Sequence, residues 1–332
     1  MAGRIWVEAW SPEYGTSYGI DSLGAGPDDA GVAIRAEPAE PVGWGPVTPE
    51  PAPLPPLAFL DGVSRVDARL FVDTGQPGGP AGGLCGSVGV GAMTTNGATR
   101  FGPMEIHRAA IFPAGGEGEL PAVPGVPAYE PRQALGPRPE DVRLALERLR
   151  EAREGLLAAA LADAGHVVIA DGRLRREQPL SVIGYIKSHE GRYLGPELAP
   201  AVAELAPGQR TPVFALTGGL TGGLSGGLSG GRHHYSWYLR LAPTPHGHPW
   251  AGVARCEVSA SLPLPKAVEL AELTAAHLPR FASRPYWDSR SPQNLVPIAT
   301  LERRLWHLLG DRELTLRRIR SAAARQPEAI GA

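Results

Sequence analysis

The chain has 332 residues, of which 43% are hydrophobic, and its formal net charge is −2 at pH 7. This length can bury a sizeable core, and the near-neutral charge means that any contact with nucleic acid must come from a local basic patch. The N-terminus lacks the apolar run of a signal peptide, and no stretch reaches the roughly 20 apolar residues that span a bilayer. We therefore expect a globular, cytoplasmic protein without membrane contact.

Glycine and proline, at 43 and 35 residues, are far above average usage, whereas lysine is almost absent beside arginine. Residues 1–56 carry little apolar periodicity, and the many prolines of 38–56 exclude a helix there. We predict an extended N-terminal arm over 1–56 and a single domain over 57–332. The four-residue glycine repeat of 218–231 has no side-chain pattern that would pack against a core, and it is typical of a flexible loop tip.

Apolar alternation in the first part of this domain predicts a meander of antiparallel strands joined by short turns. The predicted strands are 57–60, 65–72, 84–93 and 104–112. Asp61-Gly62 stands at the first of the turns, and a Gly/Pro-rich loop over 114–139 follows the last strand.

A long helix is predicted next, because Pro139 is followed by two acidic residues and the apolar pattern continues to about Ala164, before Gly165. The remaining predicted strands are 166–170, 181–187, 211–216, 234–241 and 250–259. The remaining predicted helices are 196–207, 265–277, 295–309 and 312–325. This order predicts an α/β fold with a mixed sheet flanked by helices.

Two apolar runs, LAFLDG (57–62) and VVIADG (167–172), both end in Asp-Gly. An aspartate at the end of a buried strand lies where open α/β sheets bind ligands. If Asp61 and Asp171 ended neighbouring strands, their like charges would favour a divalent cation such as Mg²⁺ or Mn²⁺. Asp-Gly after a strand is also a common turn signal, and the pattern alone leaves both interpretations open.

Seven segments, in this order, resemble the NurA nuclease family. They are FLDGVSRVDARL (59–70), VVIADGRL (167–174), GYIKSHEGRYL (184–194), RTPVFAL (210–216), HYSWYLRL (234–241), WAGVARCEV (250–258) and SPQNLVPIATLERRLWHLLGD (291–311). The resemblance implies an RNase H-like core and a manganese- or magnesium-dependent nuclease for single-stranded DNA and duplex ends. It also implies a homodimer that partners a HerA-like hexameric ATPase in the end resection of double-strand breaks.

In this resemblance Asp61 matches the first-strand metal ligand, and Asp171 matches the aspartate that follows the long helix. The family also has a glutamate on that helix, for which Glu147, Glu151 and Glu154 are the candidates. All three lie on the polar side of the predicted apolar stripe, which consists of Val142, Leu146, Leu149, Leu156 and Leu157. We favour Glu154, which is closest to Asp171 in sequence, and then Glu147; the alternative is a solvated face paired with arginines.

The family places a tyrosine and a histidine near the C-terminus. Tyr286 matches the tyrosine as a candidate catalytic residue, but no histidine follows at the expected distance, where Gln293 and Asn294 stand instead. Asp288 is therefore a candidate metal ligand, and otherwise three carboxylates would form the site.

Lys187 follows an apolar strand, and beside carboxylates it could bind the scissile phosphate, the alternative being a surface lysine. Asp67 is out of phase with the apolar residues of its strand, so we expect it to face solvent or to pair with Arg65 or Arg69. The arginines of the last two helices are predicted either to contact phosphates or to form ion pairs.

The main hypothesis is a metal-dependent DNA nuclease that acts as a single-strand endonuclease and as an exonuclease on DNA ends. The alternatives are a non-catalytic DNA- or translocase-binding adaptor of the same fold, and an RNase H-like enzyme outside this family that acts on RNA or on a branched substrate.

Overall fold

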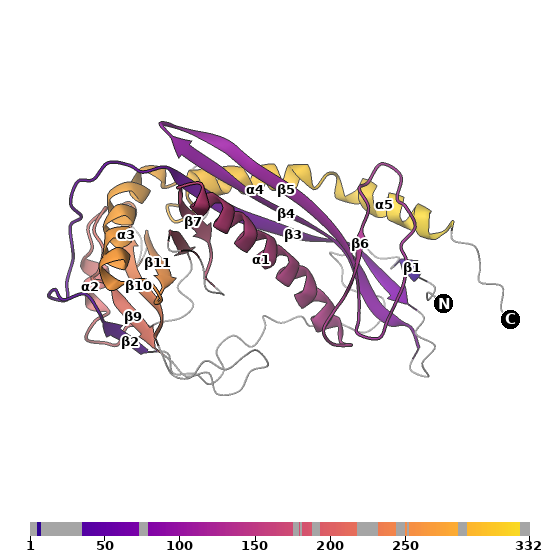
Figure 1. Cartoon of the computed structure of the whole chain (residues 1–332), viewed down its shortest axis with the longest axis horizontal. Coiled ribbons are helices and arrows are strands. Elements are labelled where there is room, and N and C mark those ends of the chain that lie inside the picture. The colour runs from indigo at the N-terminus through magenta and orange to yellow at the C-terminus, as the bar shows by residue number, and fades with distance from the viewer. Residues whose placement is uncertain are drawn as a thin grey trace.

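The computed structural model describes residues 5–7, 35–72, 79–174, 179, 181–187, 193–217, 232–243, 250, 252–284 and 291–325. Tyr286, Asp288 and the glycine repeat of 218–231 lie outside these residues. The molecule is elongated, with a long β-arm on one side and a more compact block of strands and short helices on the other (Figure 1).

The described strands form one mixed sheet in the order β2-β9-β10-β11-β8-β7-β3-β4-β5-β6, and β1 pairs with β3 off this path. The strands are β1 (Ile5–Val7), β2 (Arg35–Pro38), β3 (Leu57–Val72), β4 (Ala81–Asn96), β5 (Ala98–Phe112), β6 (Glu130–Gln133), β7 (Val167–Asp171), β8 (Val182–Ile186), β9 (Phe214–Thr217), β10 (Arg232–Arg240) and β11 (Val253–Ser259). The helices are α1 (Pro139–Asp163), α2 (Pro200–Glu204), α3 (Leu264–His277), the 3-10 helix η2 (Leu278–Phe281), α4 (Val296–Leu308) and α5 (Arg312–Ala323).

The centre of the sheet is β5-β4-β3-β7-β8. Strands β3, β4 and β5 form an antiparallel meander, α1 follows, and β7 and β8 then run parallel to β3 and to each other. The predicted α/β class with a mixed sheet is confirmed, and this strand order is compatible with the expected RNase H-like core.

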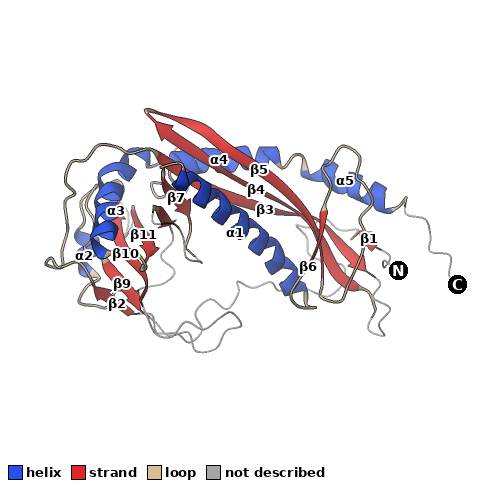
Figure 2. Ribbon diagram, in the orientation of Figure 1, coloured by secondary structure: helices blue, strands red, loops and turns tan. Residues whose placement is uncertain are grey.

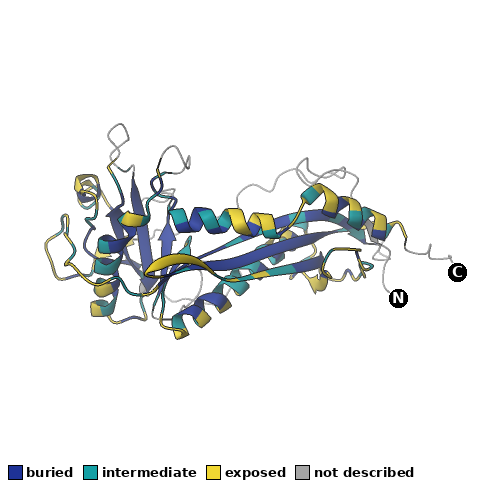
Figure 3. Ribbon diagram, turned by 90° about the horizontal axis from the view of Figure 1, so that it is seen from above, coloured by how far each residue is buried: buried dark blue, intermediate teal, exposed yellow. Residues whose placement is uncertain are grey.

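Helices cover both faces of the sheet (Figure 2). Helix α1 packs through Leu146 and Leu157 on one face, whereas α3 and α4 pack through residues such as Leu270 and Leu301 on the other. Figure 3 shows the resulting division of the helices into a buried side and an exposed side. The predicted stripe of α1 is wrong at Leu156, which is 65% exposed, because Leu157, Ala158 and Leu161 complete the buried side instead.

The predicted turn at Asp61-Gly62 is wrong, because β3 is one strand from Leu57 to Val72. Its ladder with β4 continues through these two residues, pairing Asp61 with Gly91 and Gly62 with Val90. Paired backbone groups keep the chain extended, so an Asp-Gly pair that would suit a turn remains within the strand.

The loop predicted over 114–139 contains β6, which lies parallel to β5. The sequence of this strand is Glu-Pro-Arg-Gln, which lacks the apolar alternation from which a strand is predicted. In the N-terminal arm, β2 forms an edge strand against β9, and Glu40 accepts two hydrogen bonds from the buried Arg210 guanidinium. Within the described part of the chain, no helix is long and apolar enough to cross a membrane.

Candidate carboxylate site

Asp61 and Asp171 lie side by side in the sheet. The parallel ladder between β3 and β7 runs from Leu57 opposite Val167 to Leu60 opposite Ala170, and each aspartate is the next residue on its strand. Neighbouring strands lie about 4.8 Å apart, and residues at the same register project from the same face. The parallel pairing therefore brings the two predicted carboxylates together.

The two aspartates mark a local edge of the sheet. Strand β7 ends at Asp171, whereas β3 continues for eleven residues beyond Asp61 to Val72 with β4 as its long partner. Asp61 is thus the point at which β3 loses its neighbour on one side. The prediction that a strand ends at each aspartate is therefore confirmed for β7 and wrong for β3.

Asp61 is only 8% exposed, and its Oδ1 accepts a hydrogen bond from the Gly62 amide at 2.7 Å. Burial, and then the charge of Asp171, raise the pKa of Asp61 well above its ordinary value. Lys187 opposes this rise in pKa, and Glu154 adds to it. A buried carboxyl among other carboxyls gains stability when a cation neutralises it.

Glu154 approaches from α1 and lies over Gly62, the residue after Asp61. A Cβ built on Gly62 would overlap the Glu154 Oε1 atom, so the missing side chain admits the carboxylate. Arg150 Nη1 lies 2.6 Å from Glu154 Oε1. Burial raises the pKa of Glu154 to about 7, with Arg150 opposing and Glu151 and Asp171 contributing to the rise.

The other two candidates on α1, Glu147 and Glu151, do not approach Asp61 in this way. Glu147 accepts a hydrogen bond from the Ser64 hydroxyl at 2.7 Å and pairs with Arg150 Nε at 3.1 Å. It is seven residues from Glu154, or about 10 Å along the helix axis. Glu151 lines the cleft beside the site. Of the three glutamates, Glu154 is the one whose charge affects the pKa of Asp61.

Lys187 lies directly after β8, and its Nζ is 2.7 Å from Asp171 Oδ2 and 3.1 Å from Asn294 Oδ1. The other carboxylate oxygen, Asp171 Oδ1, is enclosed and has no hydrogen-bond partner among the described residues. The surface-lysine alternative is therefore wrong. The position of Asn294 next to this lysine had no signal in the sequence, since 107 residues separate the two.

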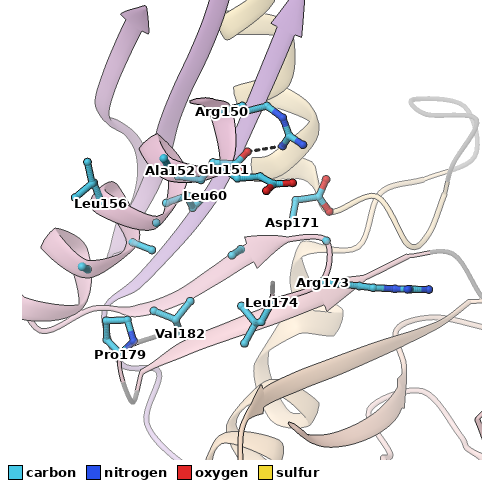
Figure 4. Close-up of a pocket in the computed structure, with 16 residues that line it drawn as sticks. Leu60, Arg150, Glu151, Ala152, Leu156, Asp171, Arg173, Leu174, Pro179 and Val182 are labelled. Atoms are coloured by element: carbon cyan, nitrogen blue, oxygen red, sulfur yellow. Dashed lines mark hydrogen bonds and ion pairs between the residues drawn. The ribbon is translucent and has the colours of Figure 1, made fainter. Parts of the chain in front are cut away.

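A cleft of about 520 Å³ opens between α1, the end of β7 and the start of β8. Arg150, Glu154 and Asp171 are among the residues that line it. Figure 4 shows Asp171 at the end of its strand, facing the helix that carries Arg150 and Glu151, while Arg173 extends away from them. The carboxylates thus border a space that a ligand can enter.

The donor chemistry suits a hard divalent cation, because the charges of Asp171 and Glu154 both affect the pKa of Asp61, and one enclosed oxygen of Asp171 has no partner among the described residues. As the side chains stand, no group of three or more His, Cys, Asp or Glu residues in the described chain is placed to hold a metal ion. Two of the three carboxylates are engaged in ion pairs, Glu154 with Arg150 and Asp171 with Lys187. Asp61 and the Oδ1 of Asp171 are the groups best placed to bind an ion.

Asp67 lies six residues further along β3 and is 0% exposed, so the expectation that it faces solvent is wrong. The alternative, a pair with Arg65, is confirmed at 2.7 Å. Tyr129 and Ser87 donate hydrogen bonds to Asp67 Oδ2, and Arg108 lies 3.5 Å from the same oxygen. Both arginines also donate to the Leu309 carbonyl at the end of α4, so this cluster joins the sheet to the C-terminal helices.

Two candidates, Tyr286 and Asp288, lie outside the described residues and stay predictions. Arg303 and Arg304 on α4, Arg317 on α5 and Arg325 just after α5 are exposed, which leaves phosphate contact open to them. Both cysteines, Cys85 and Cys256, are buried and free.

No family model matches this chain, and no curated protein matches it. Among solved structures, the chain is similar to the crystal structure of the NurA nuclease from Sulfolobus solfataricus, with 10% sequence identity and a TM-score of 0.48. The match covers 86% of this chain and 89% of that one.

Proposed function

We propose that this chain is a divalent-cation-dependent nuclease that hydrolyses phosphodiester bonds of DNA. The observation that carries the proposal is the placement of Asp61 beside Asp171 at the end of β7, with Glu154 near enough for its charge to affect Asp61, where burial raises the pKa of Asp61 and Glu154. Strongly shifted carboxyls beside a cleft are typical of functional sites, although structural ion pairs also shift pKa values.

Asp61 and Asp171 would hold the cation, proposed as Mn²⁺ or Mg²⁺. When bound there, such an ion would neutralise charge on the scissile phosphate and lower the pKa of the attacking water. Glu154, with a pKa of about 7, can accept or release a proton at Oε1 or Oε2 near neutral pH. Lys187 uses two of its three N–H groups on Asp171 and Asn294, which leaves one donor for a phosphate oxygen.

Cleavage of a labelled single-stranded oligonucleotide by the purified chain tests this function. We expect cleavage with Mn²⁺ or Mg²⁺ and none with EDTA. Asp61→Asn should reduce the rate at least about a thousand-fold, which corresponds to roughly 4 kcal/mol of lost transition-state stabilisation. Asp163→Asn, at an exposed position at the end of α1, is the matched control and should cleave normally. Full activity of a folded Asp61→Asn protein would overturn the assignment.

A binding protein without catalytic activity is the second candidate, and one observation favours it. Arg150 and Lys187 already pair with two of the three carboxylates, as they would in a site that had lost its metal. A wild-type chain that binds DNA in a salt-dependent way but never cleaves it, with any divalent ion, would support this reading.

The resemblance of the sequence to the NurA family extends the proposal to partners and setting. These are a homodimer, a HerA-like hexameric ATPase, single-stranded DNA and duplex ends as substrates, and end resection in the cytoplasm. Light scattering tests the dimer, and co-elution with a HerA-type ATPase tests the partner. A panel of DNA and RNA substrates tests the preference for DNA.

A further inference from the structure

We propose that Lys187 is a built-in cation of the site, so that the site takes one divalent ion at Asp61 and Asp171 rather than two. This inference rests on the proposed function and concerns how the site balances its charge. The two carboxylate oxygens of Asp171 differ in their contacts. Oδ2 lies 2.7 Å from the Lys187 ammonium, whereas Oδ1 is enclosed and has no partner among the described residues.

Lys187 has a second contact besides Asp171. Asn294 is 0% exposed, and its Oδ1 lies 3.1 Å from Lys187 Nζ. The neighbouring carbonyl of Gln293 accepts a 2.6 Å hydrogen bond from the hydroxyl of Tyr185, which is also 0% exposed. Burial raises the pKa of Tyr185 well above its ordinary value, so the hydroxyl stays a donor. A lysine held in this way has little freedom to leave Asp171.

The same tyrosine also fixes Asp171. Tyr185 and Asp171 are partners in the ladder between β7 and β8, and the Tyr185 carbonyl accepts a hydrogen bond from the Gly172 amide at 2.8 Å. Lys187 follows two residues later on the same chain segment. The carboxylate, the ammonium and the amide that holds it are therefore positioned by one short stretch of β8 and the residues before α4.

The choice of residue type supports a cation role. The sequence contains two lysines, Lys187 and Lys266, against thirty arginines. Arginine is the usual positive residue of this chain, yet a lysine stands beside Asp171. An ammonium is a compact point charge that can sit on a single oxygen, whereas a planar guanidinium spreads its charge over a wider fork. A compact charge is the better substitute for a metal ion.

Counting Mn²⁺ ions per chain tests the inference, by calorimetric titration and by electron paramagnetic resonance of free Mn²⁺. We expect one ion for the wild type and two for Lys187→Met, because this change removes the ammonium that neutralises Asp171 Oδ2 and leaves that charge to a second ion. Lys266→Met is the matched control and should bind one ion, since Lys266 forms an exposed pair with Glu269. Two ions in the wild type, or one ion in Lys187→Met, would overturn the inference.

A second measurement does not depend on a folded Lys187 variant. Protein labelled with ¹³C-lysine should give two Cε signals, one for each lysine. One equivalent of Mn²⁺ should broaden the Lys187 signal and leave the Lys266 signal sharp. Equal sharpness of both signals would overturn the inference. Binding of two ions with DNA cleavage would refute only the one-ion site, whereas absence of any ion binding and of any cleavage would refute the proposed function as well.

Discussion

Strand β3 carries two buried aspartates, six residues apart, with opposite surroundings. Asp67 is matched by Arg65 and Arg108 and receives hydrogen bonds from Ser87 and Tyr129. Asp61 has one hydrogen bond, from the next amide, among those resolved in the described chain, and its charged neighbours include two carboxylates. A buried charge with a full set of partners contributes to holding a fold, whereas a buried charge among like charges costs stability and is typical of a functional site. The predictions below test this contrast, from the largest effect to the smallest.

Asp67→Asn should lower the free energy of unfolding by about 3–5 kcal/mol, because it leaves two buried arginines without their counter-charge. Chemical denaturation followed by circular dichroism measures this loss. If the variant is as stable as the wild type, the cluster around Asp67 does not hold the sheet to the C-terminal helices, and the contrast with Asp61 disappears.

Glu154 should make stability depend on pH. Its pKa is about 7 in the folded chain against 4.5 ordinarily, so between these values the unfolded chain has lost a proton that the folded chain keeps. The free energy of unfolding therefore falls as the pH rises through this window, by on the order of 3 kcal/mol in buffer with EDTA. The pKa of Asp61 is also raised, so Asp61 likewise makes the free energy of unfolding fall as the pH rises.

Glu154→Gln should flatten this dependence, because glutamine carries no proton to lose. Glu140→Gln, at an exposed position in the first turn of the same helix, is the control and should keep the wild-type slope. A wild-type protein whose stability is constant from pH 4.5 to 7 would show that Glu154 is not desolvated.

Gly62→Ala should displace the Glu154 carboxylate, because the new Cβ would overlap its Oε1 atom. We expect a loss of about 1–3 kcal/mol in stability from this overpacking, together with slower DNA cleavage. Gly82→Ala, in β4, is the matched control, since no atom lies within 4 Å of its built Cβ. Unchanged cleavage in Gly62→Ala would separate Glu154 from the site.

Asp61→Asn should not destabilise the fold, in contrast to Asp67→Asn. Removing a desolvated charge that faces Asp171 and Glu154 is expected to raise the free energy of unfolding by about 0.5–2 kcal/mol, as is common when a functional residue is replaced. Thermal unfolding in EDTA measures the change. A clear loss of stability would mean that Asp61 holds the fold in the way that Asp67 does.

The sequence determined the elements that depend on local patterns. The helix from Pro139 to Asp163 was predicted within one residue because proline, acids and a closing glycine mark its ends. The strands that carry Asp61 and Asp171 were predicted from their apolar runs. Strand β6 was missed because its residues have no such pattern, and the continuity of β3 was missed because the ladder with β4 overrides a local turn signal.

Only the tertiary structure decided which residues meet. The parallel register of β3 and β7 places Asp61 beside Asp171, and the absence of a side chain at Gly62 lets Glu154 approach them. The same applies to Asn294, which reaches Lys187 from a segment 107 residues away. Periodicity and capping signals extend over a few residues, whereas register and packing depend on the whole sheet. The sequence therefore identified Asp61, Glu154 and Asp171 as candidates, whereas the fold determined which residues surround them and how their charges are balanced.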